Sequence, residues 1–248
     1  MERIDGRKAD ELRPMRLTPD FTKYAEGSVL IEHGNTMVLC NASFTEGVPR
    51  FLKDSGRGWL TAEDDMLPRA NRERSQRDIA KLKVSGRSAE IQRLIGRSLR
   101  SVVDMSVLGE NTIVIDCDVL QGDGGTRCAS ITGGFVALYM ACARMVKSGV
   151  LRKMPIRDYI AALGTGIIKI GGEDHVVVDM CYEEDSAAIA DFNVIGTGSG
   201  KIAEVQGTGE GRPYTVDELM AVVRATMPAL ACVIAEQRKI TDTLGVSL

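Results

Sequence analysis

An apolar segment of helical length, residues 126–146, constrains the fold of this chain more than any other feature. Residues 112–119 precede it and predict a strand, because apolar side chains alternate there with Asp116 and Asp118. A glycine-rich turn at 122–125 joins the two. Any fold of this chain must therefore accommodate a strand, a tight turn and a long helix in direct succession.

The remaining pattern repeats strands and helices in an α+β order. Strands are predicted at 28–44 (a hairpin around Gly34-Asn35), 160–170, 175–182, 192–197 and 201–206, and helices at 88–105 and from the Thr215/Glu218 capping box to about 241. Residues 47–68 lack a clear period and predict a functional loop. The order is used twice, which predicts two fused α/β subdomains, 1–150 and 151–248, with the break near 148–155.

Composition excludes several classes of protein. Apolar residues make up 44% and charged residues 26% of the 248 residues, as in ordinary globular proteins. We expect no membrane association, because no apolar run approaches the ~20 residues of a membrane span, and no secretory signal, because the start is highly charged. The six cysteines form no C-x-x-C pair, which argues against zinc and disulfides and predicts reduced thiols in the cytoplasm.

The charge distribution is strongly uneven. Residues 66–100 contain ten Lys or Arg and three acids, a local charge of +7, so the rest carries −10 within a total of −3. A concentrated basic stretch can bind a polyanion even on a net acidic protein. The alternative is a solvated helix face with scattered counter-charges, and charge alone leaves the two equally open.

The turn Gly124-Gly125-Thr126-Arg127 is a candidate anion site. Glycines allow close approach of the backbone, the first N–H groups of a helix lack intrahelical partners, and the helix dipole favours negative charge. Thr126 adds a hydroxyl and Arg127 a planar fork suited to phosphate. Arg87, at the start of the amphipathic helix, is a second candidate. A plain tight turn with an incidental arginine is the alternative.

An acidic pair supplies the other candidate chemistry. Asp185 and Asp191 bracket a turn between two strands, so both carboxylates could reach one cleft and bind Mg²⁺ with substrate phosphates. Asp179 could support them or be structural, and a solvated acidic loop is the alternative.

Residues 195–202 look like a P-loop but have Ile195 and Ile202 where the first glycine and the Ser or Thr belong. Two histidines without a nucleophile elbow make a catalytic triad improbable.

Several longer motifs resemble one known family. They are the opening RxDGR, GWLTAE at 58–63, MLPR at 66–69, GRS at 86–88, EIQRLIGR at 90–97, QGDGGTRCASIT at 121–132, YEEDSA at 182–187 and EVQGT at 204–208. Together these blocks span nearly the whole chain and are similar to the ribonuclease PH family. Asp64 departs from the pattern, because the family usually has an aromatic residue there, which puts one packing or RNA contact in doubt and adds negative charge beside the basic stretch.

The resemblance implies a fold and an activity. The family has an α+β fold related to domain 2 of ribosomal protein S5 and assembles as a homohexameric ring, a trimer of dimers. Its members trim nucleotides beyond the CCA end of tRNA precursors, and other RNA 3′ ends, using inorganic phosphate and releasing nucleoside diphosphates. The implied reaction is an in-line displacement with Mg²⁺, in which phosphate attacks the last phosphodiester.

The resemblance also implies roles for individual residues. Phosphate would be held by Arg87, Gly125, Thr126 and Arg127, catalysis and metal binding would fall to Asp185 and Asp191, and tRNA contact and ring assembly to Arg69, Arg74 and Arg77. One acid could instead protonate the leaving oxygen, which the sequence leaves open. Two rivals remain, a non-catalytic RNA-binding subunit of an exosome-like ring and a metal-dependent hydrolytic nuclease. The first typically loses these residues, and the second needs no phosphate turn.

Overall fold

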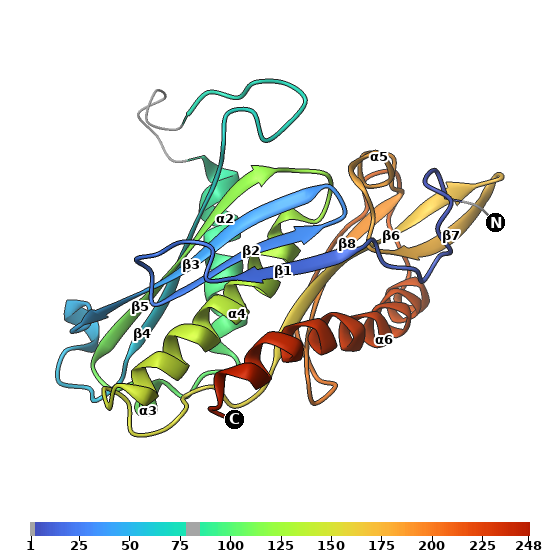
Figure 1. The fold of residues 1–248 in the computed structure, drawn as a ribbon. Helices are drawn as coiled ribbons and strands as arrows, with labels where there is room; N and C mark the ends of the chain where they lie inside the picture. The colour runs from blue at the N-terminus through green and yellow to red at the C-terminus, as the bar shows by residue number, and fades with distance from the viewer. Residues whose placement is uncertain (1–2, 78–84) are drawn as a thin grey trace.

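The computed structural model describes residues 3–77 and 85–248 and contains two α/β domains, each with its own sheet (Figure 1). The first sheet has the strand order β1-β2-β3-β5-β4, formed by β1 (Met15–Pro19), β2 (Gly27–His33), β3 (Thr36–Glu46), β4 (Trp59–Met66) and β5 (Asn111–Gln121). Neighbouring strands are antiparallel except β4 and β5, which are parallel. The hairpin predicted around Gly34-Asn35 is confirmed as β2 and β3.

The second sheet is antiparallel throughout and has the order β7-β6-β8-β9. Its strands are β6 (Ile160–Ile170), β7 (Glu173–Val178), β8 (Ala190–Thr197) and β9 (Ile202–Thr208). The predicted strand at 175–182 is too long at its end, because β7 stops at Val178 and the acidic segment forms the short helix α5 (Tyr182–Ser186). The α+β fold class is confirmed, whereas the boundary near 148–155 falls in the link between α4 and β6 and stays a prediction.

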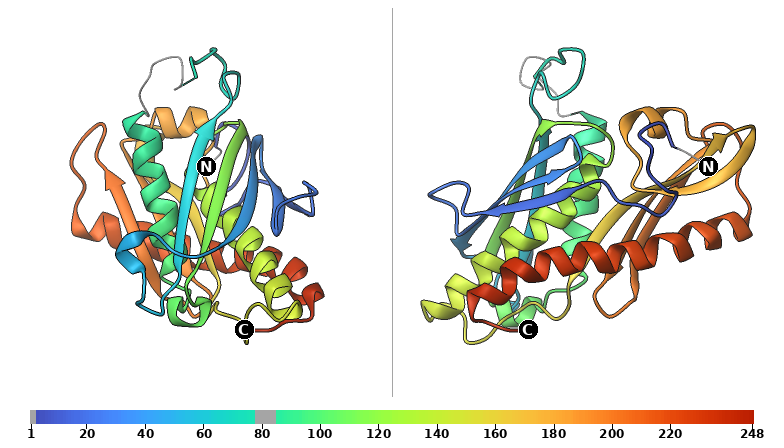
Figure 2. Two further views of the ribbon diagram at one scale, coloured as in Figure 1. Left: turned by 90° about the vertical axis from the view of Figure 1, so that its left-hand side faces the viewer. Right: turned by 45° about the vertical axis from the view of Figure 1, so that its right-hand side comes forward.

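Two long helices join the domains. They are α4 (Thr126–Lys147), which contacts β2, β3 and β6, and α6 (Val216–Thr241), which lies beside α4 and continues along the second sheet (Figure 2). Helix α2 (Gly86–Arg100) packs on β4, and α3 (Met105–Leu108), η1 (Arg50–Leu52) and η2 (Asp242–Leu244) are short. The capping box of Thr215 and Glu218 is confirmed at the start of α6, which continues through Pro228.

Helix α4 forms the centre of the core. Its residues 128–143 are all buried, which explains why this segment is apolar on every side. A Cβ added at Gly133 would lie 2.8 Å from Cγ2 of Ile31, so the glycine allows the helix to approach the first sheet closely. Core packing of α4 thereby fixes where its first turn, with the candidate anion site, stands relative to both sheets.

The expectation that no segment is apolar enough for a membrane span is wrong. Among the described residues, Thr126–Lys147 and Val216–Leu244 are both long and apolar enough by composition. The apolar window of the first is 89% buried inside the protein and that of the second 33%. A buried core helix passes the same test of length and composition, so α4 is explained by its place in the fold.

The prediction of a loop at 47–68 is also wrong for its second half, where the chain forms β4. This strand lies at the edge of the first sheet, beside β5. Its inward side chains are Leu60, Ala62 and Asp64, and the acid interrupts the apolar alternation that marks a strand in sequence.

Five of the six cysteines are buried and Cys232 is exposed.

Candidate active site

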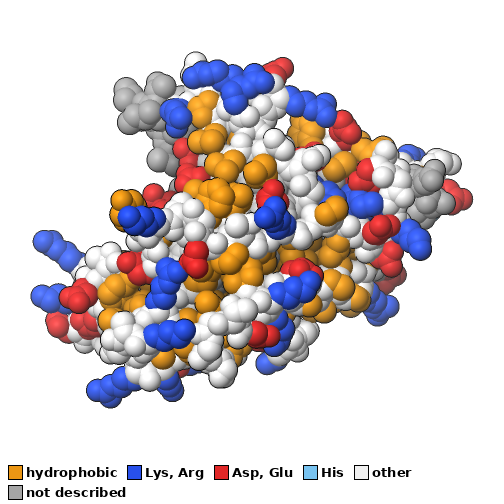
Figure 3. Space-filling model, in the orientation of Figure 1, with side chains coloured by type: hydrophobic (Ala, Val, Ile, Leu, Met, Phe, Trp, Pro, Cys, Tyr) orange, Lys and Arg blue, Asp and Glu red, His pale blue; other side chains and the backbone are white. Residues whose placement is uncertain are grey.

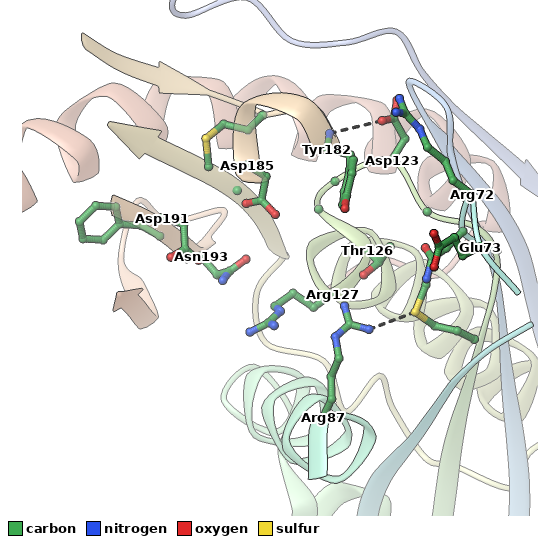
Figure 4. Close-up of a pocket in the computed structure, with 18 residues that line it drawn as sticks. Arg72, Glu73, Arg87, Asp123, Thr126, Arg127, Tyr182, Asp185, Asp191 and Asn193 are labelled. Atoms are coloured by element: carbon green, nitrogen blue, oxygen red, sulfur yellow. Dashed lines mark hydrogen bonds between the residues drawn. The ribbon is translucent and has the colours of Figure 1, made fainter. Parts of the chain in front are cut away.

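A pocket of about 660 Å³ lies where the two domains meet. It is lined by the segment after β4, the start of α2, the turn and first residues of α4, α5, and the beginning of β8 (Figure 4). It brings together all six residues predicted for phosphate binding and catalysis: Arg87, Gly125, Thr126, Arg127, Asp185 and Asp191. Residues far apart in the sequence therefore meet in one cavity of the size typical of ligand sites.

The turn before α4 presents free backbone donors to this pocket. Gly125 is the N-cap residue with a left-handed φ of 66°, and no side chain among the described residues caps the helix start. Gly124 has φ 77°, and a Cβ there would lie 2.6 Å from the carbonyl oxygen of Met180. The turn must therefore be glycine, because its backbone touches the segment leading into α5. The uncapped helix start is suited to an anion.

Two arginines point into the pocket beside each other (Figure 4). Nη1 of Arg87 lies 3.0 Å from Sδ of Met66, a weak acceptor. Nη1 of Arg127 lies 3.5 Å from both Oε2 of Glu90 and Oε1 of Gln206. These contacts are long or weak, so both guanidinium groups keep donors available for an oxyanion.

The acids come from the opposite domain. Burial raises the pKa of Asp185, and the negative charge of Asp191 raises it further, while Arg127 and Arg87 oppose the shift. Oδ1 of Asp191 is buried without a hydrogen-bond partner among the described residues. Two neighbouring carboxylates with an unpartnered oxygen fit a hard divalent cation. The described residues contain no group of three or more His, Cys, Asp or Glu for a metal, so water or substrate oxygens would complete the coordination.

A buried ion network joins the two sides of the pocket. Asp179, which has a positive φ of 55°, accepts hydrogen bonds from the backbone N (2.7 Å) and Nη2 (2.6 Å) of Arg13. His33 Nε2 lies 3.1 Å from the same carboxylate. Burial alone would raise the pKa of Asp179, but His33 and Arg13 hold it well below its usual range. Because Arg13 also donates to the carbonyl oxygen of Asp123, it ties the glycine turn to the segment before α5.

A second arginine anchors α5 itself. Nε of Arg3 donates to Oε1 of Glu184 at 2.7 Å, and its Nη1 and Nη2 donate to the carbonyls of Val178 (2.9 Å) and Asp179 (3.0 Å). Oε2 of Glu184 accepts from the backbone N of Cys181, which closes the first turn of the helix. Arg13 and His33 were not identified from the sequence, and Arg3 and Glu184 appeared only as members of the RxDGR and YEEDSA motifs. The clustering of arginines in the first sixteen residues is a signal that could have indicated such a network.

Asp64 lies inside the protein rather than on the RNA-accessible surface. It is 5% exposed, and its Oδ2 is 3.3 Å from the hydroxyl of Ser130 in α4. Burial raises its pKa to about 6, although Ser130, Arg87 and Arg127 oppose the shift. The expected negative charge beside the basic stretch is therefore a buried, readily protonated carboxyl group behind the pocket.

The arginines predicted to contact RNA lie outside the pocket. Arg69, Arg74 and Arg77 are exposed in the segment that follows β4. Figure 3 shows basic side chains gathered along the top of the molecule, over this segment. Part of the basic stretch, residues 78–84, lies outside the described residues. Within the described part, Arg69, Arg74 and Arg77 form a basic surface outside the pocket, whereas Arg72 and Arg87 line it.

Comparison with known proteins identifies the family. Residues 11–143 match the model of domain 1 of the 3′ exoribonuclease family, and residues 158–227 match that of domain 2. Ribonuclease PH of Bacillus velezensis is 51% identical over 238 residues, 96% of each chain. Ribonuclease PH of Moorella thermoacetica is 50% identical over 245 residues, 99% of this chain and 96% of the relative.

Solved structures share the fold at low sequence identity. Rice (Oryza sativa) Rrp46 superposes with a TM-score of 0.79 at 17% identity, covering 97% of this chain and 100% of that chain. The Archaeoglobus fulgidus exosome with RNA bound to the active site gives 0.79 at 23% identity, covering 95% and 92%. With both domains matched in order and half of all positions identical to bacterial relatives, this chain belongs to the ribonuclease PH family of phosphorolytic 3′-5′ exoribonucleases.

Proposed function

We propose that this chain trims the 3′ ends of tRNA precursors, and of other RNAs, in the pocket between its domains, with inorganic phosphate as the attacking group. The observation that carries the proposal is the pairing inside one cavity of an anion site (Arg87, Arg127 and the uncapped start of α4) with a pair of carboxylates (Asp185 and Asp191) that line the same cavity. A hydrolase needs the second but does not need a separate site for an anionic nucleophile, because its nucleophile is water.

The proposed reaction is an in-line exchange at phosphorus. An oxygen of the bound phosphate attacks the phosphorus of the last phosphodiester, and the bond to the 3′-oxygen of the penultimate ribose breaks. The products are a nucleoside diphosphate and an RNA one nucleotide shorter with a free 3′-hydroxyl. Two anions must meet in this step, so Arg87, Arg127 and the N–H groups of Thr126 and Arg127 lower the barrier by offsetting charge and fixing orientation.

We assign Asp185 and Asp191 to Mg²⁺. When bound there, the ion supplies positive charge that stabilises oxygens developing negative charge. The protein itself contributes the pair of hard oxygen ligands, including the buried Oδ1 of Asp191, and the rigid attachment of α5 through the buried pair Glu184 and Arg3.

Substrate, assembly and location are part of the same proposal. The exposed arginines at 69, 74 and 77 supply a basic surface that a folded RNA could contact outside the pocket. The solved structures with this fold include an exosome with RNA bound, which supports a multimeric RNA-binding protein. We propose a homohexamer, a trimer of dimers, working in the cytoplasm away from membranes.

The test is to incubate tRNA that carries extra 3′ nucleotides with Mg²⁺, with and without inorganic phosphate, and to separate the nucleotide products. Nucleoside diphosphates that appear only with phosphate are the expected result. Monophosphates formed without phosphate would show a hydrolytic nuclease. Binding of the RNA without any trimming would show a non-catalytic ring subunit.

A further inference from the structure

One aromatic side chain in the pocket has no role in the chemistry above. Two aromatic residues line the pocket, Phe192 and Tyr182. Phe192 is 1% exposed and packs edge-on against Tyr214, with ring centroids 4.6 Å apart. Tyr182 is 50% exposed, so its ring is accessible to a ligand that enters the pocket.

Tyr182 stands next to the reacting groups. It is the first residue of α5 and Asp185 is three positions on, so both side chains leave the same face of the helix, with Cβ atoms about 5–6 Å apart. The backbone N of Tyr182 also lies 3.3 Å from Oδ1 of Asp123 in the glycine turn. In Figure 4 the side chain of Tyr182 lies between Asp123 of the glycine turn and Asp185.

Arg72 covers one side of this ring. Its Cζ lies 5.9 Å from the ring centroid, and its Nη2 pairs with Oε1 of Glu183 at 2.6 Å. In Figure 4 Tyr182 lies between Arg72 on one side and Asp185 on the other. A guanidinium at this distance is attracted by the ring face. The side of Tyr182 toward Asp185 and Arg127 is directed into the pocket.

We propose that Tyr182, backed by Arg72, is the stacking surface for the base of the 3′-terminal nucleotide. The inference rests on the proposed function and identifies how that site holds its substrate. An exonuclease meets a different base after each cycle, and an aromatic ring accepts every base because each has a π-face. Stacking beside Asp185 would place the adjoining phosphodiester against the acids and facing the arginines.

A role for the hydroxyl group of Tyr182 is the alternative, and a pair of variants distinguishes the two. Tyr182→Phe keeps the ring and removes the hydroxyl, whereas Tyr182→Ala removes both. Steady-state phosphorolysis is measured with two RNAs that differ only at the 3′-terminal nucleotide, which carries either its base or an abasic ribose. Tyr24→Ala is the matched control, because Tyr24 is 89% exposed and does not line the pocket.

Stacking predicts that Tyr182→Ala raises KM for the normal RNA about tenfold or more, in line with typical losses of base–aromatic stacking, while KM for phosphate is unchanged. In Tyr182→Phe, KM for the normal RNA should stay within about twofold of the wild-type value, because the ring that stacks is retained. For the wild-type enzyme, KM for the abasic RNA should exceed KM for the normal RNA by a similar factor. For Tyr182→Ala the two RNAs should have the same KM, since loss of the ring and loss of the base remove the same interaction.

The inference is overturned if Tyr182→Ala leaves KM for RNA unchanged, if Tyr182→Phe loses as much as Tyr182→Ala, or if Tyr182→Ala still discriminates against the abasic RNA. Failure of the proposed function looks different, because wild type itself would then show no phosphate-dependent trimming. Normal trimming combined with any of the three results above rejects the stacking role alone.

Discussion

The two sides of the pocket are built in different ways. The proposed phosphate side is largely local in sequence, since a glycine turn and the helix that follows supply most of it, and its arginines are loosely held. The acid side depends on a buried network of residues far away in the chain, because Arg3 and Arg13 anchor the segment that leads into α5. An exchangeable anion can be bound by backbone N–H groups and mobile guanidinium groups, whereas paired carboxylates need a rigid frame to stay close together.

The largest effects should come from breaking one side at a time. Arg87→Ala and Asp191→Asn should each lower kcat/KM by about 10³-fold or more, because each removes stabilisation of the transition-state charge. The Arg87 variant should also raise KM for phosphate, whereas the Asp191 variant should lower kcat with KM for phosphate little changed. Asp185→Asn should behave like Asp191→Asn.

Steady-state kinetics with varied phosphate checks this difference. Arg224→Ala, on the exposed surface of α6 and outside the pocket, is the control. Activity that survives either substitution would reject the role assigned to that residue. The same rise in KM for phosphate in both variants would contradict the division of the pocket into two sides.

Breaking the link between the sides should have the next largest effect. Arg13→Met removes the guanidinium that lies nearest to the buried carboxylate of Asp179, leaves only the contacts of Arg7 (3.4 Å) and His33 (3.1 Å), and frees the carbonyl of Asp123. We expect a loss of about 3–5 kcal/mol in the free energy of unfolding. Activity should fall about 10–100-fold, the typical effect of removing a residue that orients a metal ligand. We expect kcat to fall and KM for phosphate to rise.

Urea unfolding and kinetics on the folded variant measure these two effects. Arg13→Lys keeps the charge without the fork and should recover part of the stability but less of the activity. If Arg13→Met alters stability alone, Arg13 is a structural residue and does not position the site.

A smaller effect concerns stability and has the opposite sign. The folded-state pKa of Asp64 is raised from 3.8 to about 6, so the folded protein holds this proton more tightly than the unfolded chain. Stability should therefore fall as the pH rises from about 4 to about 6 and level off above. Asp64→Asn cannot ionise, so its free energy of unfolding at pH 7.5 should exceed that of wild type by about 2–3 kcal/mol, with the difference vanishing near pH 4.

Thermal or urea unfolding across this pH range provides the measurement, and Glu63→Gln, which changes an exposed acid on the same strand, is the control. Equal stability of Asp64→Asn and wild type at pH 7.5 would show that the buried carboxylate carries no ionisation cost.

The smallest effect is expected on the basic surface above the pocket. Replacing Arg69, Arg74 and Arg77 together by Gln should weaken tRNA binding and lower the slope of log K against log salt by up to about 0.9 for each phosphate that these arginines neutralise. Trimming of a short unstructured RNA should be unaffected, because none of the three lines the pocket. An unchanged salt slope would remove these arginines from the RNA interface.

Much of the fold could be predicted because its signals are local. The glycine turn, the apolar helix after it and the Thr215 capping box depend on neighbouring residues, and the structure has each of them where it was expected. Strand β4 was missed because a buried acid, Asp64, breaks the alternation of apolar residues. Helix α5 was missed because its five residues are too few for a periodic pattern.

The site was predictable to the same extent. Gly124-Gly125-Thr126-Arg127 is a glycine turn directly before a helix, a pattern that indicates an anion site, so one side of the pocket could be identified from the sequence. The frame of the other side depends on contacts between Arg13 and Asp179, 166 positions apart, and such contacts leave no trace in local patterns. The role that we propose for Tyr182 could not be predicted from the sequence either, because its exposure and the neighbouring Arg72 appear only in the folded chain.

The most direct test of the account follows the oxygen atoms of the nucleophile. Trimming is run in ordinary water with inorganic phosphate labelled with ¹⁸O, and the released nucleotides are analysed by mass spectrometry. If phosphate bound between Arg87 and Arg127 attacks the RNA, the products are nucleoside diphosphates whose terminal phosphate carries the label. Unlabelled nucleoside monophosphates would show that water is the nucleophile and would contradict the account.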